Sequence, residues 1–198
     1  RDDKRLVIAR RWQHSPMADD RRVFRDSRSS PAKDHGVVQN MRAVVLRSHG
    51  GVEVLTFEDI DAPTPGPEEV LVRVRATSLN RADLLQRMGF YPNPFPDTHD
   101  VPGMEFSGTV IGLGARVRAW KLGDEVMGIV SGGAYAEQLV IHERQAMRIP
   151  ANVSLADAAA IPEVFITAWD ALVVQGGLTN GRWALVHAAA SGVGTAAI

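Results

Sequence analysis

The residues with the clearest chemical potential stand at the end of the chain, in the sequence VHAAASGVGTAAI. Gly192, Val193 and Gly194 begin a match there to the pattern G-x-G-x-x-A. The first glycine permits a tight bend, the second lets backbone N–H groups approach a diphosphate, and the small third residue allows close helix–strand packing. The start of the helix adds unpaired donors and partial positive charge. The pattern predicts diphosphate binding by this turn, including Ser191 just before it; a turn built only for packing is the alternative.

The turn alone does not choose between the two nicotinamide dinucleotides. An acidic residue about 20 positions further along would favour NAD, and a basic one would favour NADP. Those positions lie beyond Ile198, so both cofactors stay open on the residues alone.

Composition argues against several other kinds of site. The 198 residues contain no cysteine, which excludes disulfides, thiolate nucleophiles, iron–sulfur clusters and cysteine-based zinc sites. The net charge of −1 gives no general reason to expect nucleic acid or an anionic membrane as a partner. No apolar run approaches the ~20 residues of a membrane-spanning helix. The lack of cysteine fits a reducing compartment, and we expect a cytoplasmic protein.

The elements that must position the turn begin with a β-rich segment from Met41 to about Ile149. Its clearest strand is Glu69–Thr77, in which valines alternate with arginines. Further strands are predicted over Ala43–Arg47, Val54–Ile60, Glu105–Leu113, Glu125–Val130 and Ala134–His142. Many short strands with glycine punctuation favour a compact barrel or sandwich. Around Asn80–Arg87 the apolar period becomes that of a helix.

After Pro150 the pattern changes to that of an α/β unit. A helix is predicted over Glu163–Gln175, with a proline in its first turn. The apolar stretch Trp183–Ala188 is typical of a strand buried on both faces of a parallel sheet. Trp120, Trp169 and Trp183 are expected in the core.

The first forty residues differ in composition from the rest. They hold ten Lys or Arg and six Asp, whereas the remaining 158 residues hold twelve basic and seventeen acidic side chains. Poor apolar periodicity predicts a disordered tail over residues 1–40. We interpret it as upstream, non-native sequence before a natural start at Met41. A mitochondrial transit peptide is the alternative, disfavoured by the six Asp.

Six segments together resemble a known family. They are NRADLLQRMGFY (80–91), PGMEFSGTV (102–110), WKLGDEVMG (120–128), GGAYAEQLV (132–140), AAAIPEVFITAWDAL (158–172) and HAAASGVGTAAI (187–198). In order and spacing they resemble the zinc-independent quinone oxidoreductases, the zeta-crystallin-like branch of the medium-chain dehydrogenase/reductase superfamily. The resemblance implies a GroES-like β-rich barrel domain followed by a Rossmann domain, with the active site in the cleft between them.

This resemblance divides the chain at residues 41–153, the GroES-like catalytic domain, and 154–198, the incomplete start of a Rossmann nucleotide-binding domain. The family's Rossmann domain is much longer, so we expect an N-terminal fragment that is weakly active or inactive alone. Family members are commonly homodimers through the Rossmann domain, and we expect that surface to be missing here.

Two residues argue against catalytic zinc. Zinc-dependent relatives carry Cys where this chain has Asn80 and His where it has Met104. Amide and thioether groups do not suit a tetrahedral zinc site as those ligands do. We therefore predict no metal.

The resemblance implies a role for each of four site residues. Asn80 would lie beside the nicotinamide and the quinone, and Asp83, on the same face of one helical turn, would orient it. Tyr91 would close over the cofactor and donate a hydrogen bond. Thr167 would direct its hydroxyl toward the carboxamide.

Each of these residues also has a structural interpretation. Asn80 is a suitable helix N-cap, and Asp83 a first-turn charge favoured by the helix dipole. Tyr91 could pack within its Gly/Pro-rich loop, and Thr167 could bond to the preceding helical turn. Glu105 is expected to make a structural hydrogen bond.

The leading functional hypothesis is an NAD(P)H-dependent quinone or enone oxidoreductase, with NADPH preferred by resemblance and NADH as the alternative. The partner would be a small molecule, with no nucleic acid and no membrane. One alternative is an enoyl-thioester reductase of the same superfamily, and another is a non-enzymatic binding or crystallin-like protein.

Overall fold

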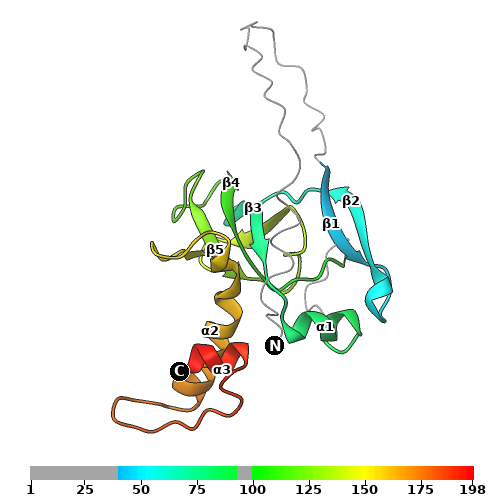
Figure 1. Cartoon of the computed structure of the whole chain (residues 1–198). Coiled ribbons are helices and arrows are strands. Elements are labelled where there is room, and N and C mark those ends of the chain that lie inside the picture. Colours follow the sequence, from blue (N-terminus) through cyan, green and yellow to red (C-terminus); the bar gives the residue numbers. More distant parts are fainter. Residues whose placement is uncertain (1–39, 93–99) are drawn as a thin grey trace, which may run out of the picture.

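The computed structural model describes residues 40–92 and 100–198. The tail predicted over residues 1–40 therefore lies almost wholly outside the described residues. Strand β1 (Asn40–Leu46) and strand β2 (Leu55–Asp61) form an antiparallel pair, joined through the short 3-10 segment η1 (Val52–Val54). This ribbon stands at one side of the β-rich part (Figure 1).

A second, five-stranded sheet carries the core. Its strands are β3 (Glu69–Thr77), β4 (Glu105–Leu113), β5 (Glu125–Ile129), β6 (Gln138–His142) and β7 (Met147–Arg148). They lie in the order β6-β3-β4-β5-β7, and every neighbouring pair is antiparallel. The bounds predicted for β3 and β4 are confirmed to the residue.

Strand β6 is shorter than the predicted Ala134–His142 because its first residues pair elsewhere. Val44 donates its N–H to the carbonyl of Tyr135 at 2.8 Å, and Glu137 donates to the carbonyl of Arg42 at 3.0 Å. The segment before β6 thus bonds to β1 and connects the ribbon to the larger sheet.

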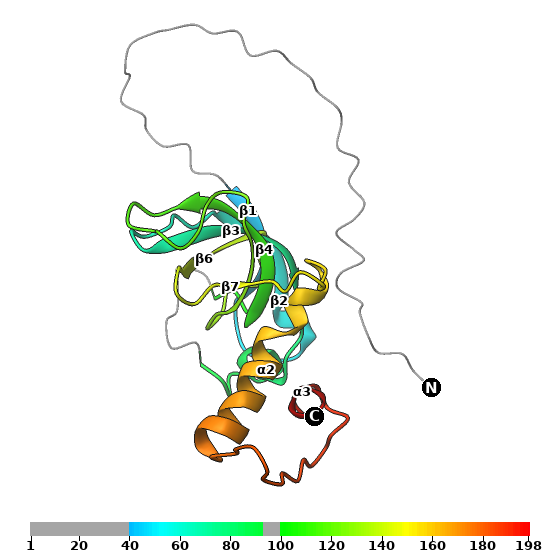
Figure 2. The same cartoon turned by 90° about the vertical axis from the view of Figure 1, so that its left-hand side faces the viewer.

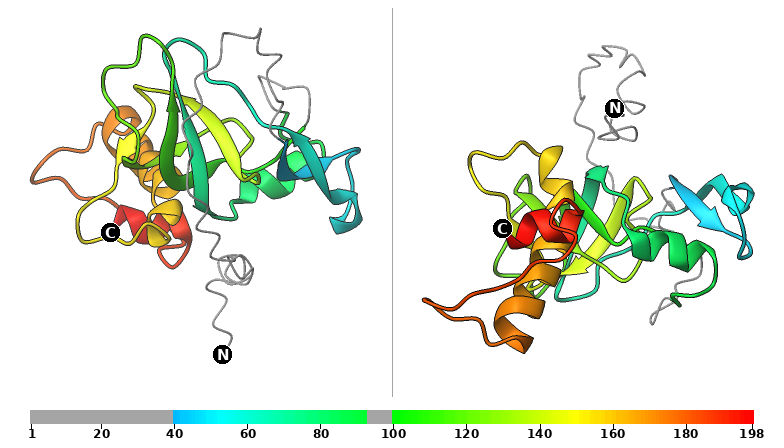
Figure 3. Two further views of the ribbon diagram at one scale, coloured as in Figure 1. Left: turned by 90° about the horizontal axis from the view of Figure 1, so that it is seen from above. Right: turned by 60° about the horizontal axis from the view of Figure 1, so that its bottom comes forward.

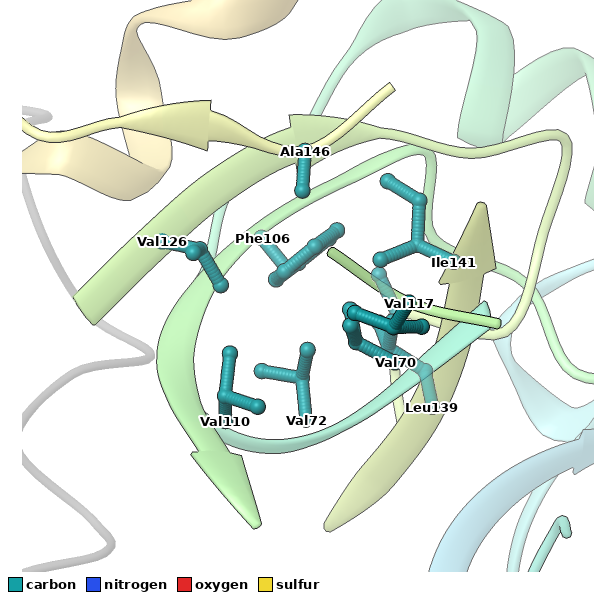
Figure 4. Packing of buried hydrophobic residues seen from close by; sticks show 10 residues of the cluster. Val70, Val72, Phe106, Val110, Val117, Val126, Leu139, Ile141 and Ala146 are labelled. Atoms are coloured by element: carbon teal, nitrogen blue, oxygen red, sulfur yellow. The ribbon is translucent and has the colours of Figure 1, made fainter. Parts of the chain in front are cut away.

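The core lies inside the curve of the five-stranded sheet (Figure 4). The inward positions of β3, Val70 and Val72, are fully buried, as the alternation predicts. They meet Phe106 of β4, which is also fully buried. Gly128 of β5 leaves room for that ring, since a Cβ there would lie 3.1 Å from Phe106 Cε1.

The helices lie below the sheets in Figure 1. Helix α1 (Arg81–Arg87) follows β3, and the 3-10 segment η2 (Asp157–Ala160) precedes helix α2 (Pro162–Trp169). The predicted helix over 163–175 is confirmed, although its second half, η3 (Asp170–Gln175), is π-helical. The short helix α3 (Gly192–Ala197) packs beside α2 (Figure 2). None of the helices in the described ranges combines the length and apolarity needed to cross a bilayer.

The strand predicted at Trp183–Ala188 is wrong. This segment belongs to a loop that extends away from the strands (Figure 3). Trp183 is 98% exposed and Trp169 is 64% exposed, so neither lies in the core. A parallel strand needs neighbouring backbone to satisfy its N–H and C=O groups. Among the described residues no strand lies beside this segment to supply those bonds.

Candidate functional site

Asn80 lies between the end of β3 and α1, where it is the N-cap residue of that helix. Its side-chain Nδ2 donates to Glu105 Oε1 at 2.8 Å. Its backbone N–H donates to Asp83 Oδ2 at 2.7 Å, completing a capping box. The structural interpretation of Asn80 as a cap is therefore confirmed. Its contact with a nicotinamide stays a prediction.

Glu105, the first residue of β4, is the most heavily used polar group of this region. It is only 1% exposed, and its carboxylate accepts from the Ser78 hydroxyl, from Asn80 Nδ2 and from the Glu163 N–H at 2.8 Å. Its backbone carbonyl also accepts from the Thr77 hydroxyl at 2.7 Å. The structural role expected for Glu105 is confirmed, with more partners than a single bond.

Asp83 is a buried carboxyl that orients its neighbours. It is 4% exposed, and besides Asn80 it accepts from the Tyr135 hydroxyl at 3.0 Å. Burial raises the pKa of Asp83 despite these two hydrogen bonds. Burial and the nearby Asp83 carboxylate likewise raise the pKa of the Tyr135 phenol. This burial favours the orienting role predicted for Asp83 over direct contact with a substrate.

Three residues of this network escaped the sequence analysis: Ser78, Tyr135 and Glu163. Ser78 is two positions before Asn80, and its proximity in the chain was a usable signal. Tyr135 comes from the segment that pairs with β1, and Glu163 contributes a backbone N–H from α2. Neither contact has a local spacing that a sequence pattern could detect.

Thr167 is exposed on α2, one helical turn after Glu163. Its hydroxyl donates to the Glu163 carboxylate, so its polar group is satisfied by the preceding turn, through a side chain and not the backbone. Burial raises the pKa of Glu163, and the carboxylates of Glu105 and Asp83 raise it further. The nicotinamide contact proposed for Thr167 is not tested by this geometry.

Glu163→Gln is expected to have a higher free energy of unfolding than the unaltered chain at pH 7, and an equal one at about pH 4. A raised folded-state pKa means that the stability contributed by Glu163 is fully present below its ordinary pKa of 4.5 and is lost above. Glutamine has no charge to repel Glu105. Because the side chain is only partly buried and solvent screens its charge, we expect a gain of less than about 1 kcal/mol at pH 7 and none at pH 4. Urea unfolding at both pH values measures it. Glu125→Gln, at an exposed position of β5, is the matched control, and an equal gain there would contradict the mechanism.

The glycine turn begins α3 and is held by its own residues. Ser191 is the N-cap, and its hydroxyl accepts from the Gly194 N–H at 3.0 Å. A Cβ on Gly194 would lie 2.3 Å from the carbonyl oxygen of Ala188, whereas one on Gly192 would meet only a Val164 methyl at 3.2 Å. The second glycine is thus required by packing. Ala188 itself has a φ of +53°, a conformation that costs alanine energy.

Helix α2 is the element that connects the two candidate regions. Its first turn donates to Glu105, which also accepts from Asn80. Val164 on the same turn lies beside Gly192, and α2 packs against α3. Tyr91 does not join this group. It is 40% exposed and follows the C-terminal end of α1, whereas Asn80 caps the N-terminal end. No hydrogen bond links Tyr91 to the network within the described residues.

A hollow of about 870 Å³ lies elsewhere, between the ribbon and the larger sheet. Its lining includes Met41, Ile60 and Leu139, and neither Asn80 nor the glycine turn borders it. We place the candidate site at the hydrogen-bonded network because polar groups with perturbed pKa values converge there. In the described ranges, no three His, Cys, Asp or Glu side chains gather as a metal site would require.

Comparison with known proteins identifies relatives of this chain. Residues 66–151 match the family described as alcohol dehydrogenase GroES-like domain. The chain is 41% identical over 161 residues to the mouse synaptic vesicle membrane protein VAT-1 homolog-like, covering 81% of this chain and 38% of that protein. It is 43% identical over 147 residues to mouse quinone oxidoreductase-like protein 2, and the match covers 73% of this chain and 41% of that protein.

Solved structures agree with these relatives. The human VAT-1 homolog-like protein superposes with a TM-score of 0.74 at 40% identity, covering 80% of this chain and 51% of that one. The quinone oxidoreductase from Coxiella burnetii superposes with a TM-score of 0.71 at 32% identity, and the match covers 81% of this chain and 52% of that one. This chain therefore spans about two fifths of its curated relatives and about half of the solved chains.

These likenesses confirm the predicted fold class, a GroES-like β-rich domain followed by the start of an α/β Rossmann domain. They also bear out the resemblance carried by the six sequence segments, since quinone oxidoreductases recur among the similar structures. Residues 66–151 thus form an alcohol dehydrogenase GroES-like domain, and the chain is similar to VAT-1 homologues, to quinone oxidoreductase-like proteins and to solved quinone oxidoreductases of the medium-chain dehydrogenase/reductase superfamily.

Proposed function

We propose that this chain supplies the substrate-side domain and the diphosphate-binding turn of an NADPH-dependent oxidoreductase that reduces a quinone or a conjugated enone. The carrying observation is the network in which Glu105 bonds to Asn80 and to the first turn of α2. Val164 in that turn lies beside Gly192, since a Cβ added to the glycine would stand 3.2 Å from its methyl group. The residue predicted beside the nicotinamide and the turn predicted beside the diphosphate are therefore linked through one helix.

The residues of the glycine turn fit a dinucleotide in part. Ser191 and Gly192 are exposed at the start of α3, and Gly192 has no Cβ to block a ligand. The Gly194 N–H is already bonded to the Ser191 hydroxyl, so a phosphate contact there would require Ser191 to rotate. The amides of Gly192 and Val193 are the more suitable donors.

The proposed reaction needs a hydride, which a bound nicotinamide supplies, and a proton. Electron-poor substrates need less Lewis-acid activation than simple ketones, and positioning contributes much of the rate. Asn80 and Met104 provide an amide and a thioether where zinc-dependent relatives have ligands, which supports a metal-free site. In this proposal the partner is a small molecule in the cytoplasm, and NADH is the alternative cofactor.

A chimera tests this function directly. Residues 41–198 would replace the matching segment of mouse quinone oxidoreductase-like protein 2, which restores a full-length relative. We expect NADPH-linked reduction of a soluble quinone. Asn80→Ser keeps an N-cap but loses the amide, and should lower kcat/KM by roughly ten- to a hundredfold. Asn152→Ala, at an exposed turn, should leave it unchanged.

The other arms of this experiment separate the alternatives. Turnover of crotonyl-CoA without turnover of quinones would favour the enoyl-thioester reductase, a class represented among the similar structures by the JamJ enoyl reductase. A folded chimera that binds NADPH but reduces neither substrate contradicts the proposal. The 198-residue chain alone is expected to bind NADPH poorly, because no strand among the described residues pairs with the segment before its turn.

A further inference from the structure

The two oxygens of the Glu105 carboxylate serve two different parts of the chain. Oε1 accepts from the Ser78 hydroxyl and from Asn80 Nδ2, both in the connection between β3 and α1. Oε2 accepts from the backbone N–H of Glu163 at 2.8 Å, in the first turn of α2. One side chain on β4 thus bonds on both sides of the predicted domain boundary at residues 153–154.

This carboxylate replaces a cap that α2 does not have locally. The N-cap residue Ile161 offers no side-chain acceptor, although the first N–H groups of a helix lack intrahelical partners. A carboxylate suits that position because of the helix dipole. Glu105 is buried, and no ion pair to it occurs among the described residues. Its charge is balanced by these hydrogen bonds and by the helix end.

We propose that Glu105 is a positioning residue that latches α2, and with it the glycine turn, onto the β-rich domain in a fixed relation to Asn80. Val164, next to Glu163, lies against Gly192, so movement of the first turn of α2 would carry the glycine turn with it. The consequence for cofactor binding rests on the proposed function. The latch itself is a property of the chain and does not depend on that function.

The arrangement requires a carboxylate. Glutamine has one acceptor oxygen, and if that oxygen keeps Ser78 and Asn80, its NH2 group faces the Glu163 N–H, donor against donor. If the glutamine amide is rotated by 180°, its oxygen keeps the hydrogen bond from the Glu163 N–H, and its NH2 group then faces the donors of Ser78 and Asn80. Aspartate keeps the charge but is one methylene shorter. Glu105→Gln should therefore release one of the two sides while leaving the volume of the core unchanged.

Amide hydrogen exchange measured by NMR on the whole chain tests the latch. In Glu105→Gln we expect exchange at residues 163–165 and 194–197 to accelerate about tenfold or more, with the β3–β4 ladder unchanged. Ser78→Ala removes one donor from Oε1 only and should leave α2 protected. Glu125→Gln controls for the charge. Release on the Asn80 side, seen at its side-chain amide, would also support two-sided use of the carboxylate.

The latch would be overturned if Glu105→Gln left amide exchange unchanged on both sides, or if it accelerated exchange equally over the whole chain. Equal release of α2 by Ser78→Ala would do the same. If the glutamine variant does not fold, the unaltered chain still decides, because the Glu163 amide should exchange about a hundredfold more slowly than in an unstructured peptide. An unprotected Glu163 amide contradicts the proposal. None of these measurements needs NADPH, so failure of the proposed function would leave the test intact.

Discussion

Phe106→Ala is expected to lower the free energy of unfolding by about 3–5 kcal/mol, enough to unfold much of a marginally stable domain. The ring is fully buried where β3, β4 and β5 meet, and it contacts the backbone of Gly128. A glycine cannot extend a side chain into the space, so the cavity would remain largely unfilled. Urea denaturation followed by circular dichroism measures the loss.

A matched control for that variant is present in the same chain. Phe57 on β2 is 76% exposed, so Phe57→Ala removes the same atoms from a position where they bury little surface. We expect a change within about 0.5 kcal/mol. Similar losses at Phe57 and Phe106 would show that the core is not where Figure 4 places it.

Asp83→Ala is expected to cost about 2–4 kcal/mol. Its carboxylate accepts from both the Asn80 N–H and the Tyr135 hydroxyl. Alanine would leave the part-buried Asn80 N–H without this acceptor, and the Tyr135 hydroxyl with only the Ser78 carbonyl at 3.3 Å. The start of α1 would also lose its capping box. Loss of this acceptor should therefore disorder the position of Asn80 as well as lower stability, and chemical denaturation with NMR of the Asn80 amide would measure both.

Two further variants make the Asp83 prediction specific. Asp59→Ala removes an exposed carboxylate on β2 and should change stability by no more than about 0.5 kcal/mol. Adding Tyr135→Phe to Asp83→Ala removes a hydroxyl that would keep only the long bond to the Ser78 carbonyl, and should recover up to about 1 kcal/mol. A double variant no more stable than Asp83→Ala would exclude the Tyr135 hydroxyl as the source of the cost.

Local signals were sufficient for the central strands β3 and β4 and for the start of α2. Alternation in β3 identified its bounds and its buried face, because side chains on a half-buried strand must alternate whatever surrounds them. The proline at the start of α2 acted in the same way, since its missing N–H is not needed there. The chemistry of Asn80 as a cap was likewise readable from its place before a helical period.

Contacts between segments far apart in the chain could not be predicted from the sequence. Tyr135 bonds to Asp83 only because the residues before β6 pair with β1, and no spacing in the sequence predicts that pairing. The stretch Trp183–Ala188 failed for the opposite reason. Its composition suits a buried strand, but composition cannot supply the neighbouring strands on which such an element depends. The link from Glu105 to α2 is a backbone contact, invisible to any pattern of side chains.

The exposure of Trp183 makes its fluorescence a probe of the surroundings of residues 183–188. An indole almost wholly in water emits at long wavelength and is open to collisional quenchers, unlike the half-buried Trp120, whose ring lies under the guanidinium of Arg148 at 4.9 Å. Any event that gave residues 183–188 a strand on either side would shift that emission to the blue. The emission wavelength of Trp183 thus reports whether residues 183–188 have gained neighbouring strands.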